Sequence, residues 1–140
     1  LFYRGAHCPI CKMQVRELQR KLNDFAKRGV TVVAISLDNK ARAQKSVDEW
    51  EIGELLLGYG LSEDIARQLD LYISSGRPGS EEPRIFSEPA MLLVKPDCSL
   101  YFASIQSMPF TRPPLDQLLQ GIDYALDHDY PTRGSLAPSN

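Results

Sequence analysis

Short apolar runs alternate with one long amphipathic segment in the first part of the chain. Residues 1–3 are apolar or aromatic and predict a buried strand. Apolar or thiol side chains then recur at steps of four and three, at positions Cys11, Val15, Leu18, Leu22 and Phe25. This spacing places them on one face of a helix, which Gly29 ends. Residues 30–37 are mostly β-branched, as in a strand covered on both faces, so the order predicts a βαβ unit with parallel strands.

The middle of the chain continues with shorter elements. Asp38 or Asn39 is expected to cap a helix over residues 40–51. Residues 55–57 read as a short strand. A polar opening at Ser62 then predicts a short helix through about residue 70.

The last part of the chain predicts a loop, a hairpin and a closing helix. Residues 74–89 are rich in Gly, Pro, Ser and charged residues and are expected to form a loop. Residues 90–94 and 100–106 read as antiparallel strands joined by a turn at residues 96–99. Thr111 is expected to cap the final helix. Its buried stripe would contain Leu115, Leu118, Leu119, Ile122 and Leu126.

This element order predicts one α/β domain over residues 1–130, with a central mixed sheet flanked by helices. Residues 131–140 are mostly polar and are expected to form a flexible tail. Leu1 is not a methionine and already lies in an expected strand. We therefore expect an N-terminal extension to be missing from the chain.

Composition narrows the classes of function. The 140 residues carry a net charge of −2, without the basic excess that non-specific nucleic-acid binding needs. No apolar run approaches the roughly 20 residues of a membrane-spanning helix. No segment reads as a signal peptide, and any targeting signal would have been lost with the residues expected to precede Leu1. We expect a cytoplasmic protein. Three cysteines are too few for a disulfide scaffold, which favours a chemical role for the thiols.

Two of the cysteines lie three residues apart at the expected start of the first helix. Pro9 follows Cys8 at the first helical position, where its missing N–H costs nothing. Free backbone N–H groups and the helix dipole should lower the pKa of Cys8 below the ordinary ~8.5. Cys11 lies on the inward face, so we expect poorer access and a higher pKa. This asymmetry predicts that Cys8 attacks and that Cys11 resolves the resulting sulfenic acid or mixed disulfide.

A redox role is favoured over two alternatives for this pair. Zinc would need about two further ligands, and besides carboxylates the chain offers only His7, His128 and Cys98. We therefore expect no metal and no other cofactor. Inert packing is the second alternative. Cys98 itself is expected to be a small surface residue in a turn.

Four further residues are candidates to support the thiolate. His7 is adjacent to Cys8 and could shift its pKa or carry a proton, or could be a rim residue. Arg4 and Arg84 could stabilise the thiolate or an oxyanion, although each could equally be a solvated surface arginine. Pro89 precedes an expected strand and could be a cis proline or a simple loop-ending residue.

Two segments carry a resemblance to a known family. Residues 2–11 read Phe-Tyr-Arg-Gly-Ala-His-Cys-Pro-Ile-Cys, and residues 90–97 read Ala-Met-Leu-Leu-Val-Lys-Pro-Asp. They resemble the thioredoxin superfamily, and more closely the peroxiredoxin-like redoxins related to alkyl hydroperoxide reductase and thiol-specific antioxidant proteins. The resemblance implies a thioredoxin-like fold, Cys8 as the peroxidatic cysteine and Cys11 as the resolving one. It also places Pro89 near the cis proline that faces the cysteine pair in thioredoxins.

The chain departs from the peroxiredoxin pattern at two places. Typical peroxiredoxins carry Pro-x-x-x-Thr-x-x-Cys, whereas Gly5 stands three residues and Leu1 seven residues before Cys8. The threonine hydroxyl that orients peroxide is therefore missing from its usual place. No arginine stands immediately before residues 90–94, where peroxiredoxins usually supply one.

Three functional hypotheses follow. The first is an antioxidant, peroxiredoxin-like thiol peroxidase that takes a hydroperoxide, is reduced by an external thiol or dithiol partner, and could dimerise. The second is a thioredoxin-like protein disulfide oxidoreductase that uses the same redox-active pair. The third is a non-enzymatic redox-sensing or binding module. None of them involves nucleic acid or a membrane.

Overall fold

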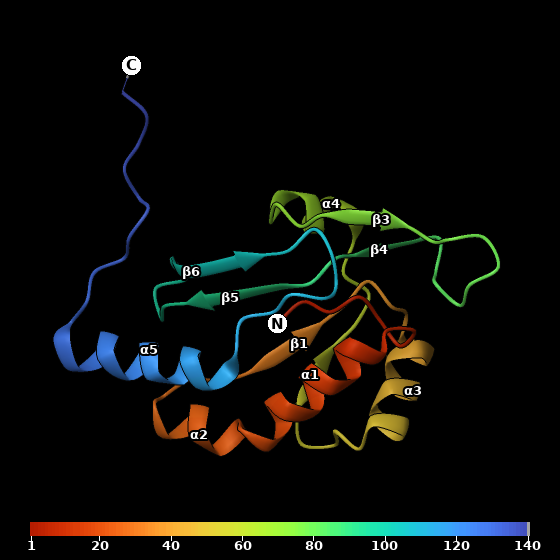
Figure 1. Ribbon diagram of the computed structural model, residues 1–140, viewed down its shortest axis with the longest axis horizontal. Coiled ribbons are helices and arrows are strands. Elements are labelled where there is room, and N and C mark those ends of the chain that lie inside the picture. Colours follow the sequence, from red (N-terminus) through yellow and green to blue (C-terminus); the bar gives the residue numbers. More distant parts are fainter. Residues whose placement is uncertain (140) are drawn as a thin grey trace.

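The computed structural model describes residues 1–139, which form a central sheet with helices on both faces and a separate hairpin (Figure 1). The sheet contains β1 (Val33–Ile35), β2 (Leu56–Gly58), β5 (Ala90–Val94) and β6 (Leu100–Ile105). Strands β1 and β2 are parallel, whereas β5 and β6 are antiparallel. The sheet is therefore mixed, as predicted.

Phe2 joins these two pairs of strands into one sheet. It forms a parallel bridge with Ile35 of β1 and an antiparallel bridge with Ala90 of β5. Its N–H donates to the Ala90 carbonyl at 2.8 Å, and the Tyr3 N–H donates to the Ile35 carbonyl at 3.1 Å. Residues 1–3 thus occupy the centre of the sheet and lead directly into the cysteine motif, although they form single bridges rather than a full strand.

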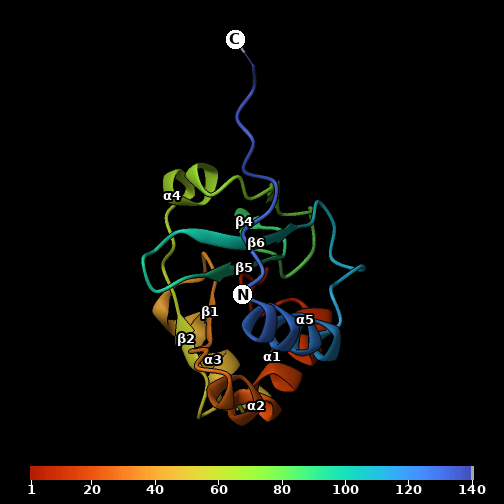
Figure 2. The same ribbon diagram turned by 90° about the vertical axis from the view of Figure 1, so that its left-hand side faces the viewer.

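Five helices cover the sheet: α1 (Pro9–Arg20), α2 (Leu22–Lys27), α3 (Lys40–Trp50), α4 (Glu63–Gln68) and α5 (Leu115–His128). Figures 1 and 2 show α1, α2 and α5 on one side of the sheet and α4 on the other. Successive residues of a strand point to opposite faces. Accordingly Met91 packs in the core beneath α1 and α5, while its neighbour Ala90 packs in the smaller core beside α4. These layers give the thioredoxin-like fold that the sequence predicts.

Local signals for helix starts and strands are mostly confirmed. The Asn39 side chain accepts a hydrogen bond from the Arg42 N–H at 2.9 Å and caps α3. Ser62 caps α4 in the same way through the Ile65 N–H. The bounds of β5 match the predicted strand. None of the helices within residues 1–139 is long and apolar enough to cross a membrane.

Two predictions in the first half are too long. The helix expected to run without a break is interrupted at Lys21, whose backbone (φ −100°, ψ 7°) is not helical and separates α1 from α2. The strand predicted over residues 30–37 is only three residues long. It is limited by the short β2, with which it pairs from Val33 to Ile35.

The region predicted as a loop at residues 74–89 contains a hairpin. Strands β3 (Ile73–Ser75) and β4 (Ile85–Ser87) are antiparallel, which confines the loop to residues 76–84. Each strand is too short to show a clear alternation in the sequence. Burial holds them in place, because Phe86 is fully buried and Ile73 packs in the core beside α4.

The start and end of the closing helix also differ from prediction. Pro114, not Thr111, is the N-cap of α5, and it provides no side-chain hydrogen bond. Leu115, Leu119 and Ile122 are buried as expected, but Leu126 is 61% exposed. The last turn of α5 extends beyond the sheet, so it has no core to contact (Figure 1). Described residues after α5 form neither helix nor strand, and their flexibility stays a prediction.

Candidate active site

The cysteine pair lies where the chain leaves the centre of the sheet and enters α1. Cys8 is the N-cap of this helix and Pro9 is its first residue, as predicted. The backbone N–H of Cys11 donates a hydrogen bond to Cys8 Sγ at 3.2 Å. This N–H is free to do so because the first N–H groups of a helix have no partner within it. No disulfide joins the two sulfurs in this structure.

Both sulfurs are buried, so the expected difference in access between Cys8 and Cys11 is almost absent. Cys8 is 1% exposed and Cys11 is 0% exposed. Both belong to the core that also contains Tyr3 and Trp50, so the loop before α1 is packed rather than open. A substrate can therefore reach Cys8 only if the surrounding chain moves.

The two thiols differ strongly in acidity. The pKa of Cys8 is lowered to about 6. The largest cause is the hydrogen bond from the Cys11 side chain, aided by the Cys11 backbone N–H and the Arg4 guanidinium, while burial opposes them. Burial raises the pKa of Cys11 far above that of an ordinary thiol, and its hydrogen bond to Cys8 raises it further. The predicted direction of both shifts is confirmed, and Cys8 is a thiolate near neutral pH.

Arg4 is held beside the thiolate by the hairpin and the residue that follows it. Its Nε lies 3.0 Å from Glu88 Oε2, and its Nη2 lies 3.6 Å from Glu82 Oε1. Its guanidinium lies over the Phe86 ring at 4.6 Å from the centroid. Glu88 is fixed in turn, since Ser74 Oγ donates to its Oε1 at 2.8 Å. The hairpin that the sequence did not predict therefore positions a charge that acts on Cys8.

Gly5 is required by the backbone that leads to Cys8. Its φ of +140° is rare for residues with a side chain, and a Cβ would lie 2.9 Å from both carboxylate oxygens of Asp38. Asp38 accepts hydrogen bonds from the Ala6 N–H at 2.7 Å and from Arg42 Nε at 2.8 Å. The buried carboxylate thus fixes the loop before α1. The position where typical peroxiredoxins carry threonine has no room for a side chain here.

Arg112 is the site residue that sequence reasoning missed. Its Nη2 donates to Cys11 Sγ at 3.3 Å, its Nη1 donates to Gln14 Oε1, and its Nε donates to the Pro109 carbonyl at 2.8 Å. It lies 101 residues from Cys11 along the chain, so no local spacing connects the two. The available signal was a single arginine in a proline-rich segment just before α5. Arg112 and the Arg4 N–H, which lies 3.4 Å from Cys11 Sγ, together surround the second sulfur.

Comparison with protein families agrees with this geometry. The model of the AhpC/TSA family matches residues 1–103, which include both cysteines, Arg4 and the hairpin. The chain belongs to the AhpC/TSA family. This is a family of thiol-dependent oxidoreductases, as the resemblance of the cysteine motif implied. No curated protein matches the chain.

Solved structures of AhpC/TSA relatives share the fold at low sequence identity. The chain is similar to a peroxiredoxin 6 of Arenicola marina, with 18% identity and a TM-score of 0.70, over 90% of this chain and 59% of that one. It is similar to a 2-Cys peroxiredoxin of Plasmodium vivax, with 19% identity and a TM-score of 0.69, over 99% and 69% of the two chains. AhpC of Enterococcus faecalis matches with 16% identity and a TM-score of 0.69, over 98% and 79%.

The AhpC/TSA chain does not bring every predicted residue to the cysteine pair. His7 packs against Phe86, with ring centroids 4.8 Å apart, and burial together with Arg4 lowers its pKa. Arg84 is exposed at the end of the hairpin loop, where its carbonyl accepts from the Gly76 N–H at 3.0 Å. Arg4 is therefore the arginine of the predicted pair that acts on Cys8.

Pro89 and Cys98 are both placed by the ends of β5. Pro89 is fully buried, and residues 1–139 contain no cis peptide bond, so of the two alternatives left open by the sequence the structure agrees with a loop-ending proline. Its carbonyl accepts from the Gln106 N–H at 2.9 Å and thereby closes the strand pair. Cys98 is exposed in the turn between β5 and β6, as predicted. In this described part of the chain, no three His, Cys, Asp or Glu side chains gather as a metal site would require.

Proposed function

We propose that the protein reduces hydroperoxides, with Cys8 as the attacking thiolate and Cys11 as the resolving cysteine. The observation that carries this proposal is the hydrogen-bonded Cys8 sulfur at the start of α1, whose pKa of about 6 keeps it ionised near neutral pH. A thiolate, not a thiol, is the nucleophile toward peroxide oxygen. Because Cys8 is buried, a small peroxide needs less movement of the surrounding chain to reach it than a larger substrate does.

The cycle needs only these two sulfurs and an external reductant. The Cys8 thiolate attacks the terminal peroxide oxygen, the O–O bond breaks, and that oxygen stays on Cys8 as sulfenic acid, while the hydroxide or alkoxide that leaves takes a proton from solvent to become water or an alcohol. Cys11 then forms a disulfide with Cys8 and releases water. A thiol or dithiol partner returns the disulfide to two thiols and is itself oxidised. In this cycle the Arg4 guanidinium lies beside the reacting oxygens and stabilises the negative charge that develops on them.

A protein disulfide oxidoreductase is the second candidate. The absence of a side chain at Gly5, where a peroxide-orienting hydroxyl would stand, favours it. The fully buried Cys8 weighs against it, because a protein substrate would have to reach a sulfur that is 1% exposed. We further propose that the protein works in the cytoplasm, a reducing compartment. We also propose that it forms a homodimer, as relatives of this kind often do.

One set of assays separates these activities. The full chain is given hydrogen peroxide, an organic hydroperoxide or insulin disulfides, each with a dithiol as the reductant. We expect peroxide consumption that Cys8→Ser reduces at least about a thousandfold, since the nucleophile is lost. Cys98→Ser is the matched control, because it removes an exposed thiol far from the pair and should leave the rate unchanged.

Three other outcomes would contradict the peroxidase proposal. Peroxide consumption that survives Cys8→Ser would show that another group reacts. Insulin reduction without peroxide consumption would select the second candidate. A reversible Cys8–Cys11 disulfide in a protein inert toward all three substrates would indicate a redox sensor.

A further inference from the structure

A groove of about 470 Å³ lies beside Cys11, between α1 and residues 112–115. Its volume is within the range of about 300–1,000 Å³ that is typical of small-molecule sites. Arg112 lines the groove and also donates to Cys11 Sγ at 3.3 Å. Arg112 therefore connects the groove to the second sulfur of the pair. Cys11 is itself fully buried, so Arg112 has to move aside before a molecule in the groove can reach that sulfur.

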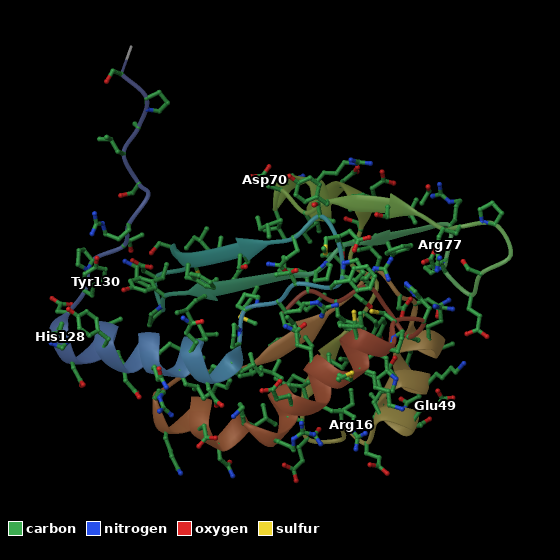
Figure 3. The ribbon with its side chains drawn as sticks, viewed as in Figure 1. Arg16, Glu49, Asp70, Arg77, His128 and Tyr130 are labelled. Carbon is green, nitrogen blue, oxygen red and sulfur yellow. The ribbon has the colours of Figure 1, made fainter. Side chains whose placement is uncertain are left out.

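The groove is basic, although the whole chain carries a net charge of −2. Lys12, Arg16, Arg20 and Arg112 line it, against Glu17 as the one acidic lining residue. Arg16 also pairs with Glu51 at 3.3 Å and points away from the sheet in Figure 3. No ion pair within the described chain involves Lys12 or Arg20. A concave surface lined by one sign of charge attracts small ions of the opposite sign.

Apolar side chains complete the groove. Ile10, Met13 and Pro113 line it together with the basic residues. Met13 is 70% exposed, so its thioether is free to contact a bound molecule. This combination suits a small organic anion with an apolar stem better than an inorganic ion.

We propose that this groove binds a low-molecular-weight thiol bearing carboxylates, and that this thiol reduces the Cys8–Cys11 disulfide by attacking Cys11. The assignment rests on the proposed function, because it names the reductant class of the same cycle. The carboxylates lie on the side of Lys12, Arg20 at the far end of α1 adds to the positive potential of the groove, and Arg112 is the group that contacts the sulfur to be attacked.

The sulfur chemistry balances with two equivalents of the thiol. The first thiolate attacks Cys11 Sγ, the Cys8–Cys11 bond breaks, and the electron pair leaves on Cys8 as its thiolate. A second thiolate then attacks the small-molecule sulfur of the mixed disulfide. This releases an external disulfide and Cys11, which takes up a proton. Attack on Cys11 is the favoured direction because the departing Cys8 thiolate is stabilised by the Cys11 backbone N–H at 3.2 Å and by Arg4, neither of which needs the Cys11 proton.

The test measures reduction of the disulfide alone, so it does not depend on peroxide turnover. The full chain is oxidised with diamide, and its reduction is followed with mercaptosuccinate, which carries two carboxylates, and with neutral 2-mercaptoethanol. In Lys12→Gln/Arg20→Gln we expect the mercaptosuccinate rate to fall about tenfold at low salt, and the 2-mercaptoethanol rate to change less than about twofold. For each thiol, the rate of the variant is divided by the rate of the unaltered protein, so the different intrinsic reactivities of the two thiols cancel.

Lys27→Gln is the matched control, since it removes an exposed lysine of α2 that does not line the groove. Equal losses with both thiols, no loss with either, or the same loss in Lys27→Gln would each overturn the proposal. Acid quenching and peptide mass spectrometry should find the transient adduct on Cys11. An adduct on Cys8 would overturn the direction of attack. If peroxide consumption fails while this selectivity holds, the proposed peroxidase function is wrong and the groove assignment stands.

Discussion

Cys8 and Cys11 have similar surroundings, but their pKa values are shifted in opposite directions. Both sulfurs are buried, and an arginine acts on each, Arg4 on Cys8 and Arg112 on Cys11. Yet the pKa of Cys8 is about 6, while that of Cys11 is raised far above its ordinary value. A nearby cation therefore does not decide which sulfur ionises.

The difference comes from the direction of the hydrogen bonds. Cys8 accepts from both the side chain and the backbone N–H of Cys11, so two donors stabilise its anion. The Cys11 thiol donates its proton in a hydrogen bond to the Cys8 sulfur. Loss of that proton would place a second negative charge beside the Cys8 thiolate, so the pKa of Cys11 is raised. The two thiols form one unit in which the acidity of the first depends on the proton of the second.

The largest change should follow from removing the Cys11 side chain as a donor. In Cys11→Ala the pKa of Cys8 should rise from about 6 toward the ordinary thiol value, because the main cause of its lowering is lost. The rate of Cys8 alkylation by iodoacetamide at pH 7 should fall about tenfold, and its half-maximum should move to higher pH. The measurement is alkylation rate against pH, by mass spectrometry.

Cys11→Ser is the matched control for that variant, since a hydroxyl can still donate to Cys8. We expect its pH profile to lie closer to that of the unaltered protein. Identical profiles for Cys11→Ala and Cys11→Ser would contradict the role of the side-chain hydrogen bond.

A smaller change should follow from Arg4→Gln. Arg4 lowers the pKa of Cys8 through a hydrogen bond and its charge, but ranks after both contributions from Cys11. The glutamine variant should shift the midpoint of alkylation upward by less than Cys11→Ala does. A shift as large as that of Cys11→Ala would mean that charge outweighs hydrogen bonding at this site.

The sequence predicts the Cys8 side of this comparison far better than the Cys11 side. Cys8 and Pro9 at a helix start form a local pattern, and so do the caps at Asn39 and Ser62, because each depends on neighbours within a few residues. Strand β5 was predicted with its correct bounds for the same reason. The burial of Cys8 was not predictable, since it depends on packing between segments distant in sequence.

Contacts between distant segments account for the other errors. Arg112 reaches Cys11 across 101 residues, and no spacing rule connects them. The β3–β4 hairpin is stabilised by burial of Phe86 rather than by a visible alternation, so its sequence predicted a loop. Because the hairpin was not predicted, the ion pairs of Arg4 with Glu82 and Glu88 were not predicted either. The residues hardest to predict are therefore those that fix the two arginines.

A third variant tests the arginine on the Cys11 side. Arg112→Gln should raise the pKa of Cys11 further, because the positive charge that favours its thiolate is lost. Closure of the Cys8–Cys11 disulfide after one equivalent of peroxide should slow about threefold to tenfold, while alkylation of Cys8 stays nearly unchanged. Rapid quenching with a thiol-blocking reagent measures the closure. A loss of Cys8 alkylation as large as the loss of closure would show that Arg112 acts on both sulfurs alike.

The smallest effect is expected for Arg84→Gln, which tests whether position rather than charge alone matters on the Cys8 side. Arg84 carries the same charge as Arg4 but is exposed. Water and salt weaken the interaction of exposed charges, with a screening length of about 10 Å at 0.1 M salt. The variant should leave the midpoint of Cys8 alkylation within about 0.2 pH units of the unaltered protein. A shift comparable to that of Arg4→Gln would mean that the net charge of the hairpin region, and not the ion pairs that hold Arg4 over Phe86, sets the acidity of Cys8.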